Sequence, residues 1–245
     1  MNPGGERKRG KPRCILFDMD NTLFDLVEAK QEACRAVVAT LPRGTGEELF
    51  EYFLRPSRGF EDPGNIEDYL LDRDCYTTES YRECVEIYKE VKLAHIEPYP
   101  GVPETLRALK EEGIRTALVT DAHRRDAIPR LEKSGLCEFF DRVITHDMTW
   151  EKKPSPIPFL YALQRIGAGP DGTLVVGDSP RRDIAPARKL GMITVYARYG
   201  DRFSRFLGDG GAAHVIDDIR ELLPLAGLHP WTRTRYPCAD VSPSR

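Results

Sequence analysis

Cys14-Ile15-Leu16-Phe17-Asp18-Met19-Asp20-Asn21-Thr22 is the stretch that decides the fold of this chain. Its first four residues are an apolar run of the length of a buried strand, and two acids follow the run. Because side chains alternate along an extended strand, Asp18 and Asp20 both look toward one side of its end. Parallel α/β sheets bind ligands at this carboxyl edge, where crowded acids are costly unless a cation or a reacting group uses them. We therefore predict the active site here, with Thr22 behind the acids.

The composition indicates a globular protein that is somewhat rich in charged residues. The chain has 245 residues, 40% hydrophobic and 31% charged, enough for one large domain or two modest ones. The formal net charge of −3 argues against a dominant nucleic-acid surface. No apolar run is long enough to cross a bilayer. The basic residues 1–12 lack the apolar segment of a signal peptide, and we expect a flexible lead-in there. Neither nucleic acid nor membrane is expected as a partner.

The six cysteines contain no CxxC pair. This pattern is typical of reduced thiols in a cytoplasmic protein rather than of a disulfide framework or a zinc site. A bridge between Cys75 and Cys84 stays open as an alternative. The cysteines are Cys14, Cys34, Cys75, Cys84, Cys137 and Cys238.

After the first strand the pattern becomes helical. Apolar residues at helical spacing predict helices over 26–41, 47–54, 66–71 and 78–96, with Pro and Gly residues between them. No segment in this region has the alternation of a strand. We therefore predict an all-helical insert over residues 26–98, of the length of a small bundle.

From residue 99 onward helices and strands alternate. The predicted helices are 103–112, 127–134, 156–166, 184–190 and 219–225. The predicted strands are 116–119, 142–145, 173–176, 193–196 and 214–216. Such alternation favours a parallel sheet with helices on both faces. We assign residues 13–25 and 99–225 to an α/β core domain, and expect residues 226–245, which are rich in Pro, Arg and Ser, to form a mobile tail.

Polar residues stand at the ends of several predicted strands. Thr120 and Asp178 follow two strands in the way that Asp18 and Asp20 follow the first. Carboxylates crowded at one sheet edge repel one another, and Asp183 adds a further acid nearby. A hard divalent cation relieves this repulsion, and oxygen ligands indicate Mg²⁺. Lys153 follows the strand over 142–145 and would offset carboxylate and phosphate charge.

Each of these features alone also has an ordinary structural explanation. Strand-end aspartates such as Asp18 and Asp20 commonly form turns or helix caps. Thr120-Asp121 could cap the next helix, Lys153 could be a solvated lysine, and Gly177-Asp178-Ser179-Pro180 could be a β-turn. Their order and shared placement favour a functional site.

The same residues resemble the motifs of the haloacid dehalogenase-like (HAD) superfamily. Asp18-Met19-Asp20-Asn21-Thr22 is similar to its DxDxT signature, Thr120 to its second motif and Lys153 to its third. Gly177-Asp178-Ser179-Pro180-Arg181-Arg182-Asp183 is similar to its GDxxxxD motif. The match spans residues 13–218, and a helical insert between the first two motifs resembles the C1-cap subfamily. The resemblance implies a Rossmann-like core with a helical lid.

The resemblance also implies a phosphatase. Asp18 would attack phosphorus to form an aspartyl-phosphate, and Asp20 would act as general acid and then as general base. Thr120, the backbone of Asp121 and Lys153 would hold phosphoryl oxygens. Many relatives have Asn where this chain has Asp121.

The implied metal site is built from the same acids. Mg²⁺ would be held by Asp18, the backbone carbonyl of Asp20, and Asp178. Asp183 would orient Lys153 or a metal-bound water. Independently, two neighbouring acids in different surroundings can divide the nucleophile and acid roles, while a metal and a lysine neutralise charge on the transferred group.

Several other functions share parts of this pattern. A dehalogenase of the same fold needs no acid for a halide leaving group, and such relatives lack the second aspartate, so Asp20 argues against it. A phosphomutase retains both aspartates and stays open. A signalling receiver domain has its acids in a different order and no helical insert after the first strand. A non-enzymatic scaffold is disfavoured because every catalytic position is filled. Nucleotide-binding functions are disfavoured because neither GxxxxGK(S/T) nor GxGxxG is present.

The substrate is expected to be a small phosphorylated metabolite: phosphoglycolate, glyceraldehyde 3-phosphate or a sugar phosphate. Arg55, Arg58 and Phe60 lie in a Gly/Pro loop of the insert, where they could meet an anionic substrate end. A solvated basic loop is an equally open interpretation. We expect a cytoplasmic monomer or homodimer.

Overall fold

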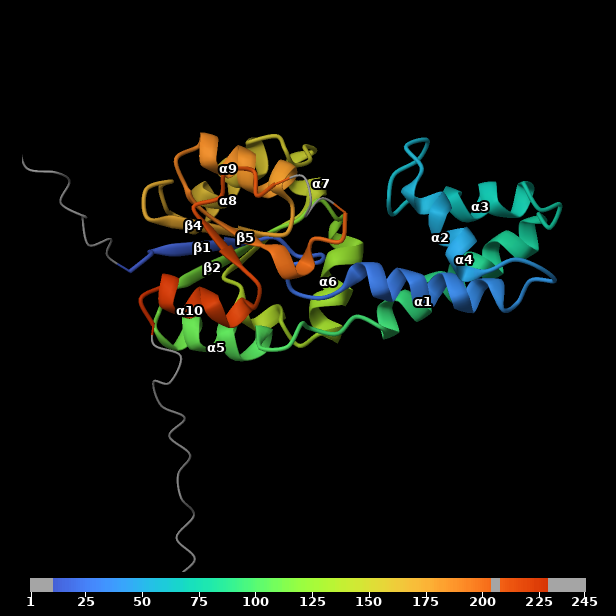
Figure 1. Ribbon diagram of the computed structural model, residues 1–245, viewed down its shortest axis with the longest axis horizontal. Helices are drawn as coiled ribbons and strands as arrows, with labels where there is room; N and C mark the ends of the chain where they lie inside the picture. Colours follow the sequence, from blue (N-terminus) through green and yellow to red (C-terminus); the bar gives the residue numbers. More distant parts are fainter. Residues whose placement is uncertain (1–10, 204–207, 229–245) are drawn as a thin grey trace, which may run out of the picture.

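The computed structural model describes residues 11–203 and 208–228, and its centre is a six-stranded parallel sheet (Figure 1). The strand order is β3-β2-β1-β4-β5-β6, so the first strand lies near the middle. This order places the carboxyl ends of β2, β1 and β4 side by side. The strands are β1 (Cys14–Phe17), β2 (Arg115–Val119), β3 (Arg142–Ile144), β4 (Thr173–Gly177), β5 (Ile193–Ala197) and β6 (His214–Ile216).

Helices cover both faces of the sheet, as predicted. Along β1, Ile15 and Phe17 belong to one hydrophobic cluster, whereas Cys14 and Leu16 belong to another. This alternation is that of an extended strand buried on both sides. The helices on the first side are α5 (Val102–Glu111), α6 (Arg124–Lys133) and α10 (Leu222–Leu225). Those on the second are α8 (Ile157–Ile166) and α9 (Ala185–Lys189).

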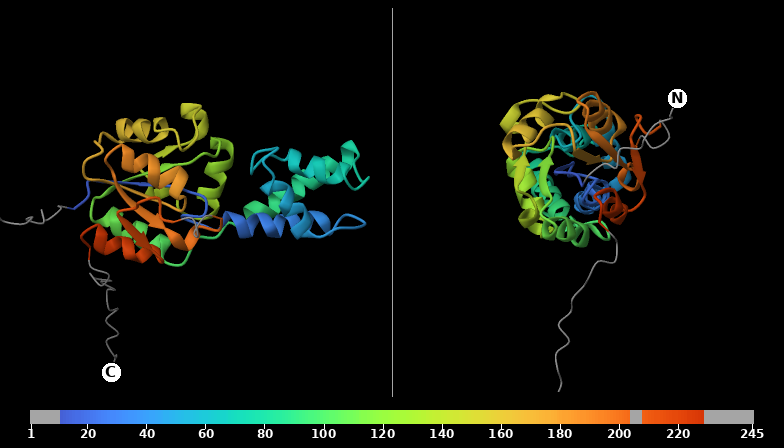
Figure 2. Two further views of the ribbon diagram at one scale, coloured as in Figure 1. Left: turned by 45° about the horizontal axis from the view of Figure 1, so that its top comes forward. Right: turned by 90° about the vertical axis from the view of Figure 1, so that its left-hand side faces the viewer.

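The predicted helical insert stands beyond the carboxyl end of β1 (Figures 1 and 2). It has a hydrophobic cluster of its own, to which all its helices contribute. Two of these helices begin with capping boxes, Thr45 with Glu48 and Thr77 with Ser80, which satisfy backbone N–H groups of the first turn. The helices are α1 (Leu26–Val38), α2 (Gly46–Leu54), α3 (Gly64–Leu71) and α4 (Thr78–Ala94).

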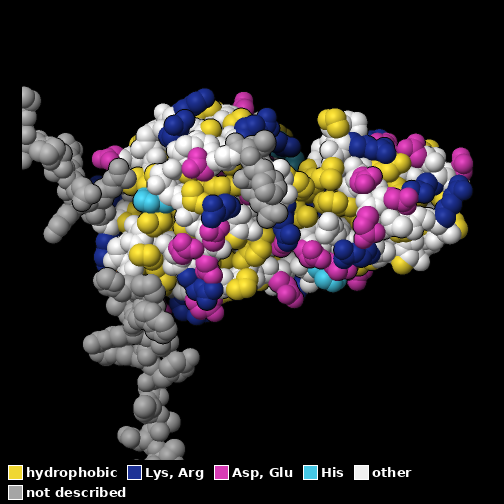
Figure 3. All heavy atoms as spheres, in the orientation of Figure 1, with side chains coloured by type: hydrophobic (Ala, Val, Ile, Leu, Met, Phe, Trp, Pro, Cys, Tyr) yellow, Lys and Arg dark blue, Asp and Glu magenta, His cyan; other side chains and the backbone are white. Residues whose placement is uncertain are grey.

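The insert meets the core over a partly apolar junction. Figure 3 shows hydrophobic side chains gathered where the two parts come together. Across this junction Phe60 of the insert and Phe203 of the core form an edge-to-face pair with ring centroids 5.9 Å apart. Helix α4 of the insert also contacts α6 of the core. The α/β sheet with an all-helical insert after its first strand is therefore confirmed.

Some elements differ from the sequence prediction. Helix α6 begins at Arg124 rather than at residue 127, because its exposed first turn carries no apolar residue and so gives no periodic signal. The backbone N–H of Arg124 is satisfied from outside the helix by Asp147 Oδ1 at 2.7 Å. The short helix α7 (His146–Thr149) and a π-helical turn, Pro180–Ile184, were not predicted. The π-helical turn places Asp183 against the end of β4.

The packed part of the chain extends slightly beyond the predicted core domain at both ends. Lys11 pairs with Glu112 at 2.9 Å and Pro12 is buried. Ala226 and Leu228 pack into the core cluster, although a mobile tail was expected from residue 226. Residues 1–10 and 229–245 lie outside the described residues, so the flexibility expected there stays a prediction.

Two other sequence predictions have structural outcomes. Cys75 and Cys84 are free thiols, so the alternative of a bridge between them is wrong; Cys238 lies outside the described residues. Within the described ranges no helix has both the length and the hydropathy to span a bilayer.

Candidate active site

Three chain segments meet at the carboxyl edge of the sheet. Asp18 follows β1, Thr120 follows β2 and Asp178 follows β4, and these three strands are neighbours. The strand ladder continues into the first two segments: the N–H of Asp18 donates to Val176 O at 2.9 Å, and the N–H of Thr120 donates to Ile144 O at 3.0 Å. The site is therefore held by the backbone of the sheet itself.

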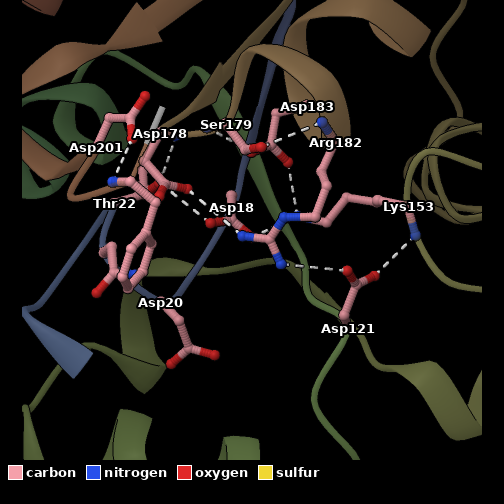
Figure 4. A network of polar contacts seen from close by, with 12 residues as sticks. Asp18, Asp20, Thr22, Asp121, Lys153, Asp178, Ser179, Arg182, Asp183 and Asp201 are labelled. Atoms are coloured by element: carbon pink, nitrogen blue, oxygen red, sulfur yellow. Dashed lines mark hydrogen bonds and ion pairs between the residues drawn. The ribbon is translucent and has the colours of Figure 1, made fainter. Parts of the chain in front are cut away.

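Thr22 ties two of these segments together. Its hydroxyl donates to Asp18 Oδ2 at 3.1 Å and accepts from the backbone N–H of Asp178 at 3.1 Å. Thr22 is fully buried, so both partners are fixed in place. Figure 4 shows Asp18 at the centre of the resulting polar network.

Lys153 holds the other oxygen of the Asp18 carboxylate. Its Nζ donates to Asp18 Oδ1, to Asp183 Oδ1 at 2.7 Å and to Val119 O at 3.1 Å. All three ammonium protons therefore have acceptors. Burial opposes the charge of this lysine, but the carboxylates of Asp18 and Asp183 outweigh it and raise the pKa of Lys153. The lysine is a fixed positive charge at the site.

Asp183 packs over the end of β4. Its Oδ2 accepts the N–H of Ser179 at 3.1 Å. A Cβ at Gly177 would lie 2.5 Å from the Asp183 side chain, so a glycine is needed at that position. Burial raises the pKa of Asp183 to about 6, against the opposing effect of Lys153.

The acidic residues fit a divalent cation. Carboxylate oxygens of Asp18, Asp178 and Asp183 lie within 4.8 Å of one another. Asp178 Oδ1 is buried without a hydrogen-bond partner among the described residues, and the nearest cationic group, Arg182 Nη2, is 4.0 Å away. Burial and the charges of the two neighbouring acids raise the pKa of Asp178 well above its usual range. A hard cation with oxygen ligands would remove this imbalance.

The side chain of Asp20 lies outside that cluster and points away from it (Figure 4). Arg130 of α6 donates from one nitrogen, Nη1, to both Asp20 oxygens, at 2.8 and 2.9 Å. The same guanidinium donates to Glu61 of the insert, from Nη1 at 3.3 Å and also from Nη2. Burial raises the pKa of Asp20 to about 6; Arg130 opposes the rise, and Glu61 and Asp18 add to it. Asp18 and Asp20 therefore have different surroundings, as separate chemical roles require.

Thr120 and Asp121 organise the loop after β2. Thr120 Oγ1 accepts the N–H of Ala122 at 3.1 Å, and Asp121 Oδ1 accepts the N–H of Lys153 at 2.9 Å. The interpretation of Thr120-Asp121 as the cap of the next helix is wrong, because the N-cap residue of α6 is His123. Asp121 instead fixes the backbone that carries Lys153, and Arg182 lies 3.6 Å from its second oxygen.

Arg55 and Arg58 are not brought to this cluster. Arg58 donates to both oxygens of Asp68 at 2.8 Å. The Arg55 guanidinium lies 3.3 Å from the ring centroid of Tyr52 and 3.7 Å from Asp72. Both arginines are bound within the insert in this structure, and their role in binding substrate stays a prediction.

The sequence patterns did not predict the contacts of Arg130, Glu61 or Arg182. A role for Thr22 could be predicted from the sequence, because Thr22 belongs to the first motif. A role for Arg130 could not, since an arginine on a charged helix has the same local pattern whether it is exposed or buried.

Comparisons with known proteins identify a family and several relatives. A family model described as haloacid dehalogenase-like hydrolase matches residues 15–197. The chain is 31% identical to the phosphoglycolate phosphatase of Pseudomonas putida, over 87% of this chain and 79% of that protein. It is 30% identical to a glyceraldehyde 3-phosphate phosphatase of Methanocaldococcus jannaschii, over 86% and 95% of the two chains. Among solved structures, a candidate β-phosphoglucomutase from Thermotoga maritima matches with a TM-score of 0.75 at 25% identity, over 87% of this chain and 99% of that one.

Proposed function

This chain belongs to the haloacid dehalogenase-like hydrolases and is a phosphoric monoester hydrolase, and we propose that it is a Mg²⁺-dependent phosphatase acting on small phosphorylated metabolites through an aspartyl-phosphate. The observation that carries the proposal is the arrangement around Asp18. One of its oxygens is held by Lys153 and the other by Thr22, beside an oxygen of Asp178 to which no described residue donates a hydrogen bond. This preorganises a carboxylate for attack on phosphorus.

In the proposed reaction an oxygen of Asp18 forms a bond to phosphorus while the ester oxygen leaves and takes a proton from Asp20. Water then attacks the phosphorus, gives a proton to Asp20 and releases phosphate and Asp18. Lys153 and the loop of Thr120 and Asp121 would hold phosphoryl oxygens. Mg²⁺, held by Asp18, Asp178 and the backbone of Asp20, with Asp183 beside them, would supply positive charge to the transferred group.

The substrate candidates are phosphoglycolate, glyceraldehyde 3-phosphate and sugar phosphates. Relatives named as phosphatases of the first two compounds are 31% and 30% identical to this chain. We propose that residues 26–98 act as the cap that sets specificity, since they stand beyond the sheet edge that carries Asp18. A cytoplasmic location, and a monomeric or homodimeric state, belong to the same proposal.

A phosphomutase is the second candidate, favoured by the fold match to the Thermotoga protein. It would pass the phosphoryl group to a second substrate hydroxyl rather than to water. A dehalogenase is disfavoured because Asp20 is present.

The proposal is tested with a panel of phosphorylated metabolites in the presence of Mg²⁺. Wild type should release phosphate from at least one of them, and Asp18→Asn should release none while melting at a similar temperature. Phosphate release that survives in Asp18→Asn would remove Asp18 as the nucleophile. Recovery of an isomeric phosphate ester in place of free phosphate would establish the mutase.

A further inference from the structure

Arg130 is an unusual residue of the core. It is 2% exposed, and among the described residues it is the largest fully buried side chain. Its guanidinium is always charged and keeps all its protons, so burial is tolerated only when acceptors surround it. These acceptors are Asp20 of the core and Glu61 of the insert, 110 and 69 residues away in the sequence.

Asp20 depends on this arginine for its orientation. Within residues 11–203 and 208–228, Arg130 is the sole side chain that hydrogen-bonds the Asp20 carboxylate. The carboxylate is directed away from Asp18 (Figure 4). An in-line displacement places the leaving oxygen on the side of phosphorus opposite the attacking one. An acid that serves the leaving oxygen must therefore reach away from Asp18, and this is the direction in which Arg130 holds the Asp20 carboxylate.

The other partner of Arg130 belongs to the insert. Glu61 lies between α2 and α3, and its carboxylate accepts hydrogen bonds from both Nη1 and Nη2 of Arg130. It also pairs with Lys92 of α4 at 3.3 Å. The neighbouring Phe60 is anchored as well: its carbonyl accepts from Lys30 Nζ, which lies 3.8 Å from the Phe60 ring centroid. The acceptor that Arg130 requires is thus held firmly by the insert.

We propose that Arg130 is a positioning residue for Asp20, and that Glu61 makes this positioning depend on the docking of the insert against the core. The inference rests on the proposed function, in which Asp20 protonates the leaving oxygen. Arg130 transfers no proton itself. It fixes where the acid stands, and a displacement of about 1 Å in a catalytic group costs up to about a hundredfold in rate.

The test separates positioning from structure by varying the leaving group. An aryl phosphate such as p-nitrophenyl phosphate expels a stable phenolate without an acid, whereas an alkyl phosphate needs one. For Arg130→Met, kcat/KM should fall about 10- to 100-fold with an alkyl phosphate that wild type accepts, and no more than about 2-fold with the aryl phosphate. Arg125→Met, in the exposed first turn of the same helix, is the matched control and should leave both values unchanged.

Equal losses with the two substrates, or no loss with either, would overturn the role of Arg130. If Arg130→Met does not fold, Glu61→Gln and Arg130→Lys carry the test, and each should show the same selective loss of alkyl phosphate activity. Adding Glu61→Gln to Arg130→Met should cost nothing further, because Glu61 acts through Arg130. Fully additive effects would remove Glu61 from the proposal. Wild-type activity and its loss in Asp18→Asn are measured first, so that failure of the proposed function is recognised separately.

Discussion

The hydroxyl of Thr22 accepts a hydrogen bond from the backbone N–H of Asp178 at 3.1 Å, which joins the loop after β1 to the loop after β4. The same hydroxyl donates to Asp18. One buried oxygen atom therefore links the proposed nucleophile, Asp18, to Asp178, an acid of the proposed metal site.

We expect Thr22→Val to disrupt this link without changing the size of the side chain. It would leave the N–H of Asp178 unsatisfied in a buried position, at a cost of about 1–3 kcal/mol in the free energy of unfolding. Turnover should fall as well, because Asp18 loses one of its two orienting contacts. The matched control is Thr105→Val: the Thr105 hydroxyl is buried and has no partner among the described residues, so its removal should be neutral or stabilising. Chemical denaturation compares the variants, and equal losses of stability would contradict the expectation.

Metal binding should be visible as a change in thermal stability. With a hundredfold excess of Mg²⁺ over its dissociation constant, wild type should gain about 2–3 kcal/mol over the protein in chelator. Asp178→Asn should lose most of this gain. In chelator it should melt above wild type, since it removes a buried carboxylate whose ionised form is disfavoured. A full Mg²⁺-dependent shift in Asp178→Asn, or full activity of wild type in excess chelator, would refute the metal assignment.

Lys30 should give the stability a distinct pH dependence. It is fully buried in the insert, and burial lowers its pKa from 10.5 to about 7. Between these values the unfolded chain binds more protons at this residue than the folded one, so Lys30 makes the free energy of unfolding rise from pH 7 toward pH 10.5. Below pH 7 the contribution of Lys30 to the free energy of unfolding no longer changes with pH and is destabilising.

Lys30→Met removes this titration together with the hydrogen bond to Phe60, so the pH dependence is the quantity to compare: the free energy of unfolding of Lys30→Met minus that of wild type should be largest near pH 7. The difference should shrink as the pH rises toward 10. Lys89→Met, at an exposed position on α4, should leave the pH profile unchanged. Parallel profiles for wild type and Lys30→Met would show that Lys30 does not titrate in this range.

Gly200 should tolerate no side chain. A Cβ there would lie 1.6 Å from the backbone oxygen of Asn21, in the loop that carries Asp18 and Asp20. Gly200→Ala must push that loop away, and we expect it to cost more than about 2 kcal/mol and most of the activity. Gly169→Ala is the control, because no atom lies within 4 Å of the added carbon. A Gly200→Ala variant as stable and active as Gly169→Ala would contradict this packing.

Much of the site could be predicted because its signals are local. The apolar run before Asp18, the helical spacing of residues 26–98 and the alternation after residue 99 each depend on neighbours in the sequence. Parallel strands bring their carboxyl ends to one edge, so a polar residue after each strand predicts a shared location. The structure accordingly places Asp18, Lys153 and Asp178 together.

The tertiary structure decided which charges meet. Arg58 and Arg130 are both arginines of charged segments, yet one pairs with Asp68 within the insert and the other joins Asp20 to Glu61. Local periodicity does not distinguish these outcomes, because an ion pair across 110 residues forms only once the insert packs against the core. The alternation of strands and helices along the chain and the helical period are properties of neighbouring residues and follow from the sequence by itself. The burial of Arg130 and the orientation of Asp20 depend on how distant segments close around them, since the free energy of a buried charge is set by the acceptors that surround it.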